Sequence, residues 1–365
     1  MEKIIRVGII GQGRSGRNIH AFALELPRLN TKYKIVAVSD RIPERMKETL
    51  ENNPGCKAYE NYKDMLKDPE IDLIVNATQS KDHVDVSIEA LEAGYAVLCE
   101  KPMAAHLADV DRLEAAVKRT GKFFAMFQQS RFAPTFRKIR EVMDSGVLGR
   151  IVMVKMAFNC FARRWDWQTL QYMDAGSLLN TGPHPLDQAL QLMGNVDPDQ
   201  ILCVMDRANT FGDAEDHVKL IMTAKDRPTI DLEVSSCCMY SPYVYSVYGT
   251  QGCLLGDHKK LDWKFYRPVE APAQKLIRTP LEGRVYCSEN LSFYEEHWES
   301  SDEGMKFEFR TEMLYLDLYE ALVNGKELEV QFDEVRRQIM VIEECHRQNP
   351  LSRDFEPENA ERRPR

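Results

Sequence analysis

The sequence predicts a doubly wound parallel α/β domain followed by an α+β domain with a mainly antiparallel sheet. In the first third of the chain, short β-branched runs alternate with amphipathic stretches, which is typical of repeated β-α-β units. After about residue 131 the runs alternate apolar with polar residues and are separated by turns, as in antiparallel sheets. The length of 365 residues and the hydrophobic content of 44% also exceed what one ordinary domain needs.

The first domain is predicted over residues 1–125. Its strands are short apolar runs of the kind that a parallel sheet buries on both faces, at 4–10, 34–39, 73–76, 96–99 and 123–128. Apolar residues at helical spacing predict connecting helices, among them 84–93 and 107–120.

The second domain is predicted over residues 126–351. Period-two alternation predicts strands at 151–158, 200–206, 217–223, 229–235 and 243–248, and the last of these runs into a turn at 249–252. Helical spacing predicts helices at 185–193, 309–323 and 332–347. Residues 352–365 are polar and charged and contain proline, so we expect a flexible tail.

Composition excludes several classes of function. A formal net charge of -9 and an isoelectric point near 5.5 argue against binding of nucleic acid. The start of the chain is typical of a strand and turn rather than of a signal peptide, and no stretch predicts a membrane span. Nine cysteines without a CxxC pair favour free thiols in a reducing cytoplasm. No spacing of ligands predicts a metal site.

A glycine-rich turn follows the first predicted strand, in the order Gly11-Gln12-Gly13-Arg14-Ser15-Gly16. Such glycines let the backbone approach a pyrophosphate at a helix N-terminus, where free amides favour negative charge. Strand two ends at Asp40, whose carboxylate is placed to accept hydrogen bonds from the adenosine ribose. These residues predict an NAD site. NADP stays an alternative, because the neighbouring Arg41 and Arg45 could reduce the repulsion of a 2′-phosphate by Asp40.

Two further strands end in residues that we assign to the cofactor. Ala77 and Thr78 follow the strand at 73–76, and as small residues at the edge of the sheet they leave room for the nicotinamide half. His83 follows them, where a structural role and a cofactor contact are both open. Glu100-Lys101-Pro102 follows the strand at 96–99 and places a cation where the reactive ring would lie, within reach of a substrate hydroxyl.

The segment Asn180-Thr181-Gly182-Pro183-His184-Pro185 leads into a helix. Pro185 suits the first helical turn, so His184 is expected near the N-terminus, where the helix dipole disfavours an imidazolium. A neutral ring is able to accept a proton, as a base for alcohol oxidation must. Asp187, in the first turn, is expected to stabilise the helix end.

Substrate contacts are predicted between the first strand of the second domain and the histidine segment. Aromatic faces beside hydrogen-bonding groups suit a sugar ring, which has an apolar face and a polar rim. The predicted substrate contacts are Arg131, Asn159, Arg163, Trp165, Trp167, Tyr172, Asn180 and His184. A second aromatic and acidic segment, 293–298, is expected to cover the site or to meet a neighbouring subunit.

Taken together, these motifs resemble the glucose-fructose oxidoreductase, inositol dehydrogenase and MocA-type family. The resemblance runs from about Lys3 to Leu351. It implies a Rossmann domain, a second domain with a large open sheet, and NAD- or NADP-linked oxidation of sugars, cyclitols or related polyols. It also implies homo-oligomers, as dimers, tetramers or larger assemblies, packed through the open face of the sheet.

By the same resemblance, Lys101 is the lysine that contacts the reacting hydroxyl and His184 is the catalytic histidine. Position 180 departs from the family pattern. Many relatives have an aspartate there, which helps relay the proton, whereas this chain has Asn180. An amide positions a hydroxyl but cannot take its proton, so we assign the proton to His184 and treat Asn180 as an orienting contact.

These residues predict a dehydrogenase that transfers hydride from a secondary hydroxyl of a sugar, glycoside or cyclitol to nicotinamide. Two alternatives stay open at this stage. The first is an enzyme with tightly bound, recycled NAD that oxidises a sugar transiently for elimination or epimerisation. The second is a non-catalytic NAD-binding redox sensor.

Overall fold

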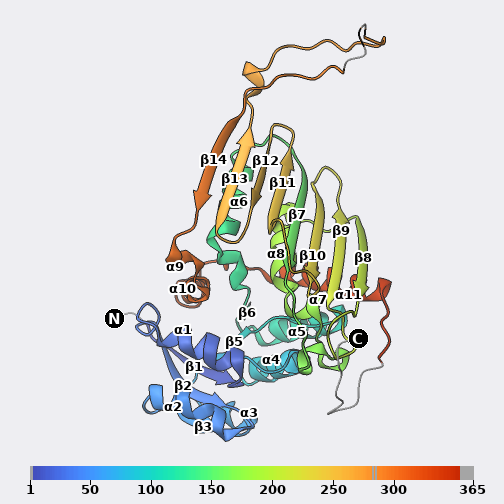
Figure 1. Cartoon of the computed structure of the whole chain (residues 1–365). Coiled ribbons are helices and arrows are strands. Elements are labelled where there is room, and N and C mark those ends of the chain that lie inside the picture. Colours follow the sequence, from blue (N-terminus) through green and yellow to red (C-terminus); the bar gives the residue numbers. More distant parts are fainter. Residues whose placement is uncertain (1–2, 282, 284–285, 354–365) are drawn as a thin grey trace.

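The computed structural model describes residues 3–281, 283 and 286–353, and it contains two sheets with helices packed on them (Figure 1). The predicted fold class is confirmed: one sheet is parallel, and the other is larger and mainly antiparallel. The predicted tail lies outside the described residues from position 354 onward. No described helix is long and apolar enough to cross a membrane.

The first sheet has six parallel strands in the order β3-β2-β1-β4-β5-β6. Its strands are β1 (Ile5–Ile10), β2 (Tyr33–Ser39), β3 (Lys57–Tyr59), β4 (Leu73–Asn76), β5 (Ala96–Cys99) and β6 (Phe124–Met126). Its helices are α1 (Phe22–Glu25), α2 (Lys47–Asn52), α3 (Tyr62–Met65), α4 (His83–Glu92) and α5 (Leu107–Thr120). The strand order reverses between β1 and β4, which is where open α/β sheets bind ligands.

The second sheet has eight strands in the order β14-β13-β12-β11-β7-β10-β9-β8, with only β7 and β10 parallel. They are β7 (Ile151–Asn159), β8 (Gln200–Asp206), β9 (His217–Thr223), β10 (Thr229–Ser235), β11 (Tyr245–Gly249), β12 (Gly252–Gly256), β13 (Lys260–Phe265) and β14 (Tyr294–Glu299). The helices are α6 (Pro134–Asp144), α7 (Ser177–Asn180), α8 (Pro183–Leu192), α9 (Asp302–Met305), α10 (Phe307–Asn324) and α11 (Phe332–Gln348).

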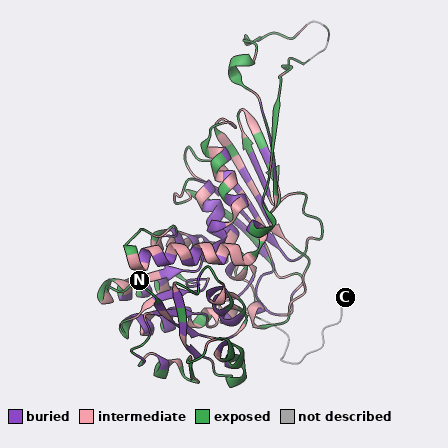
Figure 2. Ribbon diagram, turned by 90° about the vertical axis from the view of Figure 1, so that its left-hand side faces the viewer, coloured by how far each residue is buried: buried purple, intermediate pink, exposed green. Residues whose placement is uncertain are grey.

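One face of the second sheet carries the helices. Helix α8 lies on β7 and β10, and α11 lies on β8. The apolar residues between them belong to a core that continues to α4 and α5 of the first sheet (Figure 2). Residues of the opposite face are exposed, among them Leu202, Val204 and Leu255.

Helix α10 comes late in the chain but packs on the first sheet. The Tyr33 hydroxyl donates to the Tyr315 carbonyl at 2.7 Å, and the Tyr319 hydroxyl donates to the Lys3 carbonyl at 2.8 Å. Both tyrosines of α10 are buried in the core cluster around β1 and β2. The same helix begins beside the second sheet, so it connects the two parts of the molecule.

Several elements were not expected from the sequence. The strands β3, β12 and β13 and helix α6 were absent from the prediction, and the predicted boundary after residue 125 falls inside β6. Between β13 and β14 a long, mostly exposed excursion extends away from the sheet (Figures 1 and 2). The segment 293–298, expected to cover the site or meet a neighbour, lies in edge strand β14 from residue 294 onward, and none of its residues lines the cavity beside His184.

Candidate active site

The turn after β1 has the shape that a dinucleotide phosphate needs. Gly11 has φ of +88°, and a Cβ there would lie 2.4 Å from the Ala77 carbonyl oxygen. A Cβ on Gly16 would lie 1.8 Å from the Gly11 carbonyl oxygen, so both positions exclude any side chain. A Cβ on Gly13 would meet no atom within 4 Å, which leaves open space for a ligand beside this backbone.

Asp40 is fixed beside this turn. One carboxylate oxygen accepts the Gln12 N–H at 2.8 Å and the other accepts the Ile42 N–H at 2.8 Å. Each oxygen keeps a lone pair for a ribose hydroxyl. Arg14 and Arg41 are exposed nearby in the sequence, and Ser15 is half-buried. The turn and the carboxylate therefore fit a dinucleotide, with Asp40 at the ribose.

The loops after β4 and β5 are joined through His83. Its Nδ1 lies 2.7 Å from the Pro102 carbonyl oxygen, and its Nε2 lies 3.3 Å from the Thr78 carbonyl oxygen. The ring is buried, and burial lowers its pKa. Because both nitrogens face carbonyl oxygens of the protein, the structure favours the structural one of the two roles that the sequence left open for His83. Buried Ala77 and half-buried Thr78 remain at the edge of the sheet beside the glycine turn.

Glu100 lies at the end of β5 in a chain of buried polar groups. One carboxylate oxygen accepts the Lys101 backbone N–H at 3.0 Å, and the other lies 3.2 Å from His20 Nε2. His20 Nδ1 lies 2.7 Å from the Tyr315 hydroxyl. Burial raises the pKa of Glu100, but the hydrogen bond and charge of His20 and the charge of Lys101 outweigh burial and lower the pKa to about 2. Glu100 is therefore a fixed anion beneath the site.

The Lys101 ammonium points from the first sheet toward α7. Its Nζ donates to the Asn180 carbonyl oxygen at 2.7 Å and lies 3.4 Å from Asn180 Oδ1. Burial lowers the pKa of Lys101, the charge of Glu100 opposes this shift, and the charges of Arg14 and Arg164 add to it. An ammonium has three donors, so one remains for a substrate hydroxyl.

His184 lies in the first turn of α8, and its tautomer follows from Gln128. Gln128 Nε2 donates to the Pro183 carbonyl oxygen at 2.7 Å and to Gln338 Oε1 at 3.3 Å, which fixes Gln128 Oε1 as the atom that faces the imidazole. That oxygen lies 2.8 Å from His184 Nδ1. Since it can only accept, Nδ1 carries the proton and Nε2 presents a lone pair.

The charge state of His184 agrees with this tautomer. Burial lowers the pKa of His184 to about 3, and the positive charges of Lys101 and Arg310 contribute, while Glu100 opposes them. The imidazole is therefore neutral at neutral pH. No residue in the described part of the chain hydrogen-bonds its Nε2.

Asn180 is held between the two parts of the site. Its Oδ1 accepts from Gln168 Nε2 at 3.2 Å and faces Lys101, and Gln168 in turn accepts from Arg164. The structure thus brings together Lys101, Asn180 and Arg164 at the edge of the first sheet. Position 180 supplies a neutral oxygen to the lysine where an aspartate would supply a charge.

A cavity of about 380 Å³ opens beside His184, between α8, the second sheet and the start of α10. Its wall combines aromatic rings with hydrogen-bonding groups, which suits a ring-shaped polar ligand. The side chains that matter below are His184, Gln188, Tyr245, His258, Phe307 and Arg310.

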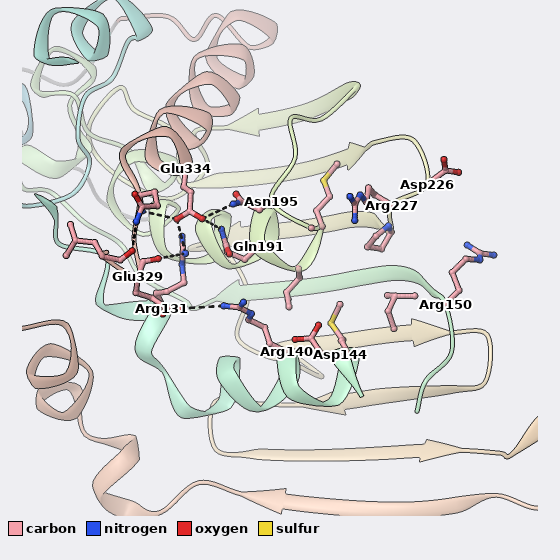
Figure 3. Close-up of a pocket in the computed structure, with 18 of the residues that line it drawn as sticks. Arg131, Arg140, Asp144, Arg150, Gln191, Asn195, Asp226, Arg227, Glu329 and Glu334 are labelled. Carbon is pink, nitrogen blue, oxygen red and sulfur yellow. Dashed lines mark hydrogen bonds and ion pairs between the residues drawn. The ribbon is translucent and has the colours of Figure 1, made fainter. Parts of the chain in front are cut away.

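Arg131 does not contact this cavity, contrary to the prediction. Its side chain is 1% exposed and donates to both oxygens of Asp187, at 2.7 and 2.5 Å, and to Glu334 at 3.0 Å. These ion pairs hold the 3-10 turn η4 (Gln129–Phe132), α8 and α11 together. A larger hollow of about 720 Å³ lies beside them, lined by a mixture of arginines and carboxylates (Figure 3). None of the residues that line it belongs to the Lys101 and His184 site.

Asn159 is also misassigned by the sequence. Successive residues of a strand point to opposite faces, and Phe158 lines the cavity beside His184. Asn159 therefore points to the open face, where its Nδ2 donates to Glu233 at 2.5 Å.

The aromatic loop before α7, residues 163–172, contacts the site through only some of its residues. Trp165 is 77% exposed and Tyr172 is 58% exposed, with Lys81 Nζ 5.9 Å from the Tyr172 ring centroid. The Arg163 guanidinium lies 5.5 Å from the Phe211 ring centroid, and Trp167 is half-buried at the start of a 3-10 turn. From this loop, Gln168 donates to Asn180 Oδ1, and Arg164 donates to Gln168. No group of three metal-ligating side chains occurs in the described residues.

Comparison with known proteins agrees with this geometry. Residues 5–128 match the family model described as oxidoreductase family, NAD-binding Rossmann fold, and residues 136–255 match the GFO/IDH/MocA C-terminal domain. The chain belongs to the GFO/IDH/MocA oxidoreductase family. The sequence-based family assignment and the NAD-binding type of the first domain are thereby confirmed.

Relatives in this family are named dehydrogenases. Trans-1,2-dihydrobenzene-1,2-diol dehydrogenase of Bos taurus is 31% identical over 56% of this chain and 61% of its own length. Myo-inositol 2-dehydrogenase of Thermotoga maritima is 26% identical over 70% of this chain and 75% of its own length. The match to the dihydrodiol dehydrogenase thus spans about three fifths of that relative.

Solved structures share the fold over nearly the whole chain. The WlbA dehydrogenase from Bordetella pertussis, solved with NADH and UDP-GlcNAcA, gives a TM-score of 0.75 at 21% identity, covering 95% of this chain and 97% of that one. An NAD-binding protein from Listeria innocua gives a TM-score of 0.76 at 22% identity, covering 97% and 100%.

Proposed function

We propose that this chain is an NAD-dependent dehydrogenase that oxidises a secondary hydroxyl group of a sugar, glycoside or cyclitol. The observation that carries the proposal is the neutral His184 at the wall of the cavity, whose Nε2 has no hydrogen-bond partner within the described ranges. The family assignment and the diol and inositol dehydrogenases among the relatives support it.

His184 is the base in this reaction. A hydroxyl in the cavity donates to Nε2, and the imidazole takes its proton as the C–H hydride leaves. The bond from Nδ1 to Gln128 becomes stronger as the ring gains charge, because an imidazolium is the better donor. Bound NAD supplies the acceptor for the hydride.

Lys101 stabilises the substrate oxygen as its proton departs. Its third N–H is free for that oxygen, and Asn180 fixes the direction of the ammonium. Asn180 does not take part in proton transfer, because its oxygen faces two donors and its amide nitrogen has no proton-accepting lone pair.

NAD is the expected cofactor form. The Asp40 carboxylate lies where the adenosine ribose is bound, and a 2′-phosphate there would meet a fixed negative charge. Arg45 Nη1 lies 4.0 Å from Asp40 and reduces this discrimination. The open face of the second sheet, with Leu202, Val204 and Leu255 exposed, supports the proposal of a homo-oligomer.

The test is turnover with NAD across a panel of free monosaccharides, cyclitols and intact glycosides, followed by absorbance of the reduced nicotinamide. Steady growth of that absorbance with one class, lost in His184→Asn while NAD still binds, is the expected result. Tightly held NAD with product formation but no net reduction would favour recycling. NAD binding without any reaction would favour a sensor.

A further inference from the structure

Arg310 stands out because it is a cation at the cavity wall that has no acidic partner among the residues the structure describes. It lies in the first turn of α10, its side chain is half-buried, and its guanidinium lies 5.2 Å from the Phe307 ring centroid. It makes no hydrogen bond or ion pair with any residue in the described ranges. By contrast, buried Arg131 uses its guanidinium to hold two carboxylates.

The surroundings of Arg310 do not neutralise it. Among the described residues that line the cavity there is no aspartate or glutamate, and Arg310 is the only one with a permanent charge. Burial lowers the pKa of Arg310, and Tyr245 and Glu308 oppose that shift, although Glu308 is not within ion-pair distance. A guanidinium has five N–H donors, and in the described part of the chain no residue accepts from those of Arg310.

His258 adds a second donor to the same wall. Its ring lies edge-on to Phe158 at 5.3 Å and to Tyr245 at 6.3 Å between centroids, and its nitrogens have no hydrogen-bond partner among the described residues. Burial lowers the pKa of His258, and the charge of Arg310 lowers it further, so the ring is neutral and keeps one N–H donor.

We propose that Arg310 and His258 form a carboxylate-binding subsite, and that the substrate is an acidic sugar or polyol whose carboxylate lies there while its hydroxyl faces His184. The part of this inference that concerns the substrate rests on the proposed function, because it places the reacting hydroxyl at His184. A carboxylate matches the planar fork of one guanidinium and carries the single charge that the wall lacks.

Size and charge favour this choice over other ligands. A volume of about 380 Å³ lies at the lower end of the range of about 300–1,000 Å³ for small-molecule pockets, which suits one ring with one substituent. A neutral sugar would leave the guanidinium unpaired. A phosphate carries nearly two charges at neutral pH, for which the cavity offers one permanent cation.

The experiment compares matched compounds on the wild type and two variants. Glucuronate is paired with glucose and quinate with myo-inositol, and glucose 6-phosphate is the phosphate arm. For each, kcat/KM with NAD is measured for wild type, Arg310→Met and Arg310→Lys. Arg140→Met is the matched control, because Arg140 is 41% exposed and makes one ion pair at 3.6 Å away from the cavity.

We expect the acidic member of at least one pair to be preferred by about a hundredfold or more, since a neutral analogue leaves a desolvated charge unpaired. Arg310→Met removes that preference, Arg310→Lys keeps part of it, and Arg140→Met keeps all of it. Equal use of acidic and neutral compounds, unchanged in Arg310→Met, would overturn the inference and leave the proposed function intact. A preference for the phosphate would overturn the choice of carboxylate.

A binding arm separates failure of the subsite from failure of the proposed function. Thermal unfolding of each variant is measured with and without glucuronate and NAD, which also shows whether Arg310→Met folds. Stabilisation by glucuronate that requires Arg310, without turnover of any compound, would retain the anion subsite and refute the dehydrogenase. Stabilisation that is the same in wild type and Arg310→Met would refute the subsite.

Discussion

Replacement of Arg131 by methionine should destabilise the protein without removing a substrate contact. The side chain is 1% exposed and donates four hydrogen bonds, three to carboxylate oxygens of Asp187 and Glu334 and one to the Glu329 carbonyl oxygen. Removal of one partner of a buried ion pair leaves uncompensated charge and costs about 3–5 kcal/mol. Of the donors in the described part of the chain, Asp187 would then retain only the Gln338 amide, at 2.8 Å.

The assay is urea unfolding followed by tryptophan fluorescence, together with KM for a substrate of the wild type at a temperature where the variant is folded. Arg140→Met is the control, and because its only ion pair is exposed it should cost less than about 1 kcal/mol. A lysine at position 131 should fall between wild type and methionine, because it cannot make the bidentate contact. Unchanged stability in Arg131→Met with a large rise in KM would refute this assignment and restore the substrate contact.

Further predictions concern charge and pH. Asn180→Asp places a carboxylate beside Lys101 and should raise its pKa, so the alkaline limb of kcat/KM moves to higher pH. His184 has a pKa near 6.5 in the unfolded chain and about 3 in the folded protein. The free energy of unfolding should therefore fall as the pH drops through that window, by up to ~3 kcal/mol at pH 4. In urea unfolding at several pH values, His184→Asn should show a weaker dependence of stability on pH. The pKa of Glu100 is about 2 in the folded protein and about 4.5 in the unfolded chain, so Glu100 adds a further loss of stability as the pH falls below about 4.5. Asp40→Ser should lower the NAD to NADP ratio of kcat/KM by about tenfold or more.

The fold was predictable because its signals are local. The alternation in 200–206, 217–223 and 229–235 gave the bounds of β8, β9 and β10, and the apolar run at 73–76 gave β4. The short strands β12 and β13 were missed, since each is five or six residues and lies beside turns that mask its alternation. Edge strand β3 has three exposed or half-exposed residues and carries no apolar signal.

The site residues were predicted from motifs, and their roles stay predictions. The glycine turn, Asp40, Lys101 and His184 follow recognisable strand ends or helix starts, and the structure brings Lys101 to Asn180 across the two sheets. Gln128 was missed, although its place at the end of a predicted strand gave a usable signal. The sequence carried no signal for Arg310, because this residue belongs to a helix far along the chain and only the packing of the fold brings it near His184.

The misassignments have the same origin. Asn159 was assigned from its residue type. Side chains alternate between the two faces along β7, so that of Asn159 points away from the cavity. Arg131 is a polar residue close to the site in sequence, but it is buried with its guanidinium nitrogens facing protein acceptors. A sequence does not record which polar groups have already found partners.

The most direct test is the rate of hydroxyl oxidation in His184→Asn and Gln128→Leu beside the wild type, with NAD affinity measured for each. Proton abstraction by a tautomer fixed through Gln128 predicts a loss of turnover of about a thousandfold or more in His184→Asn and a smaller loss in Gln128→Leu, with unchanged NAD affinity. Turnover in folded His184→Asn within a few fold of the wild type would contradict the assignment of His184 as the base.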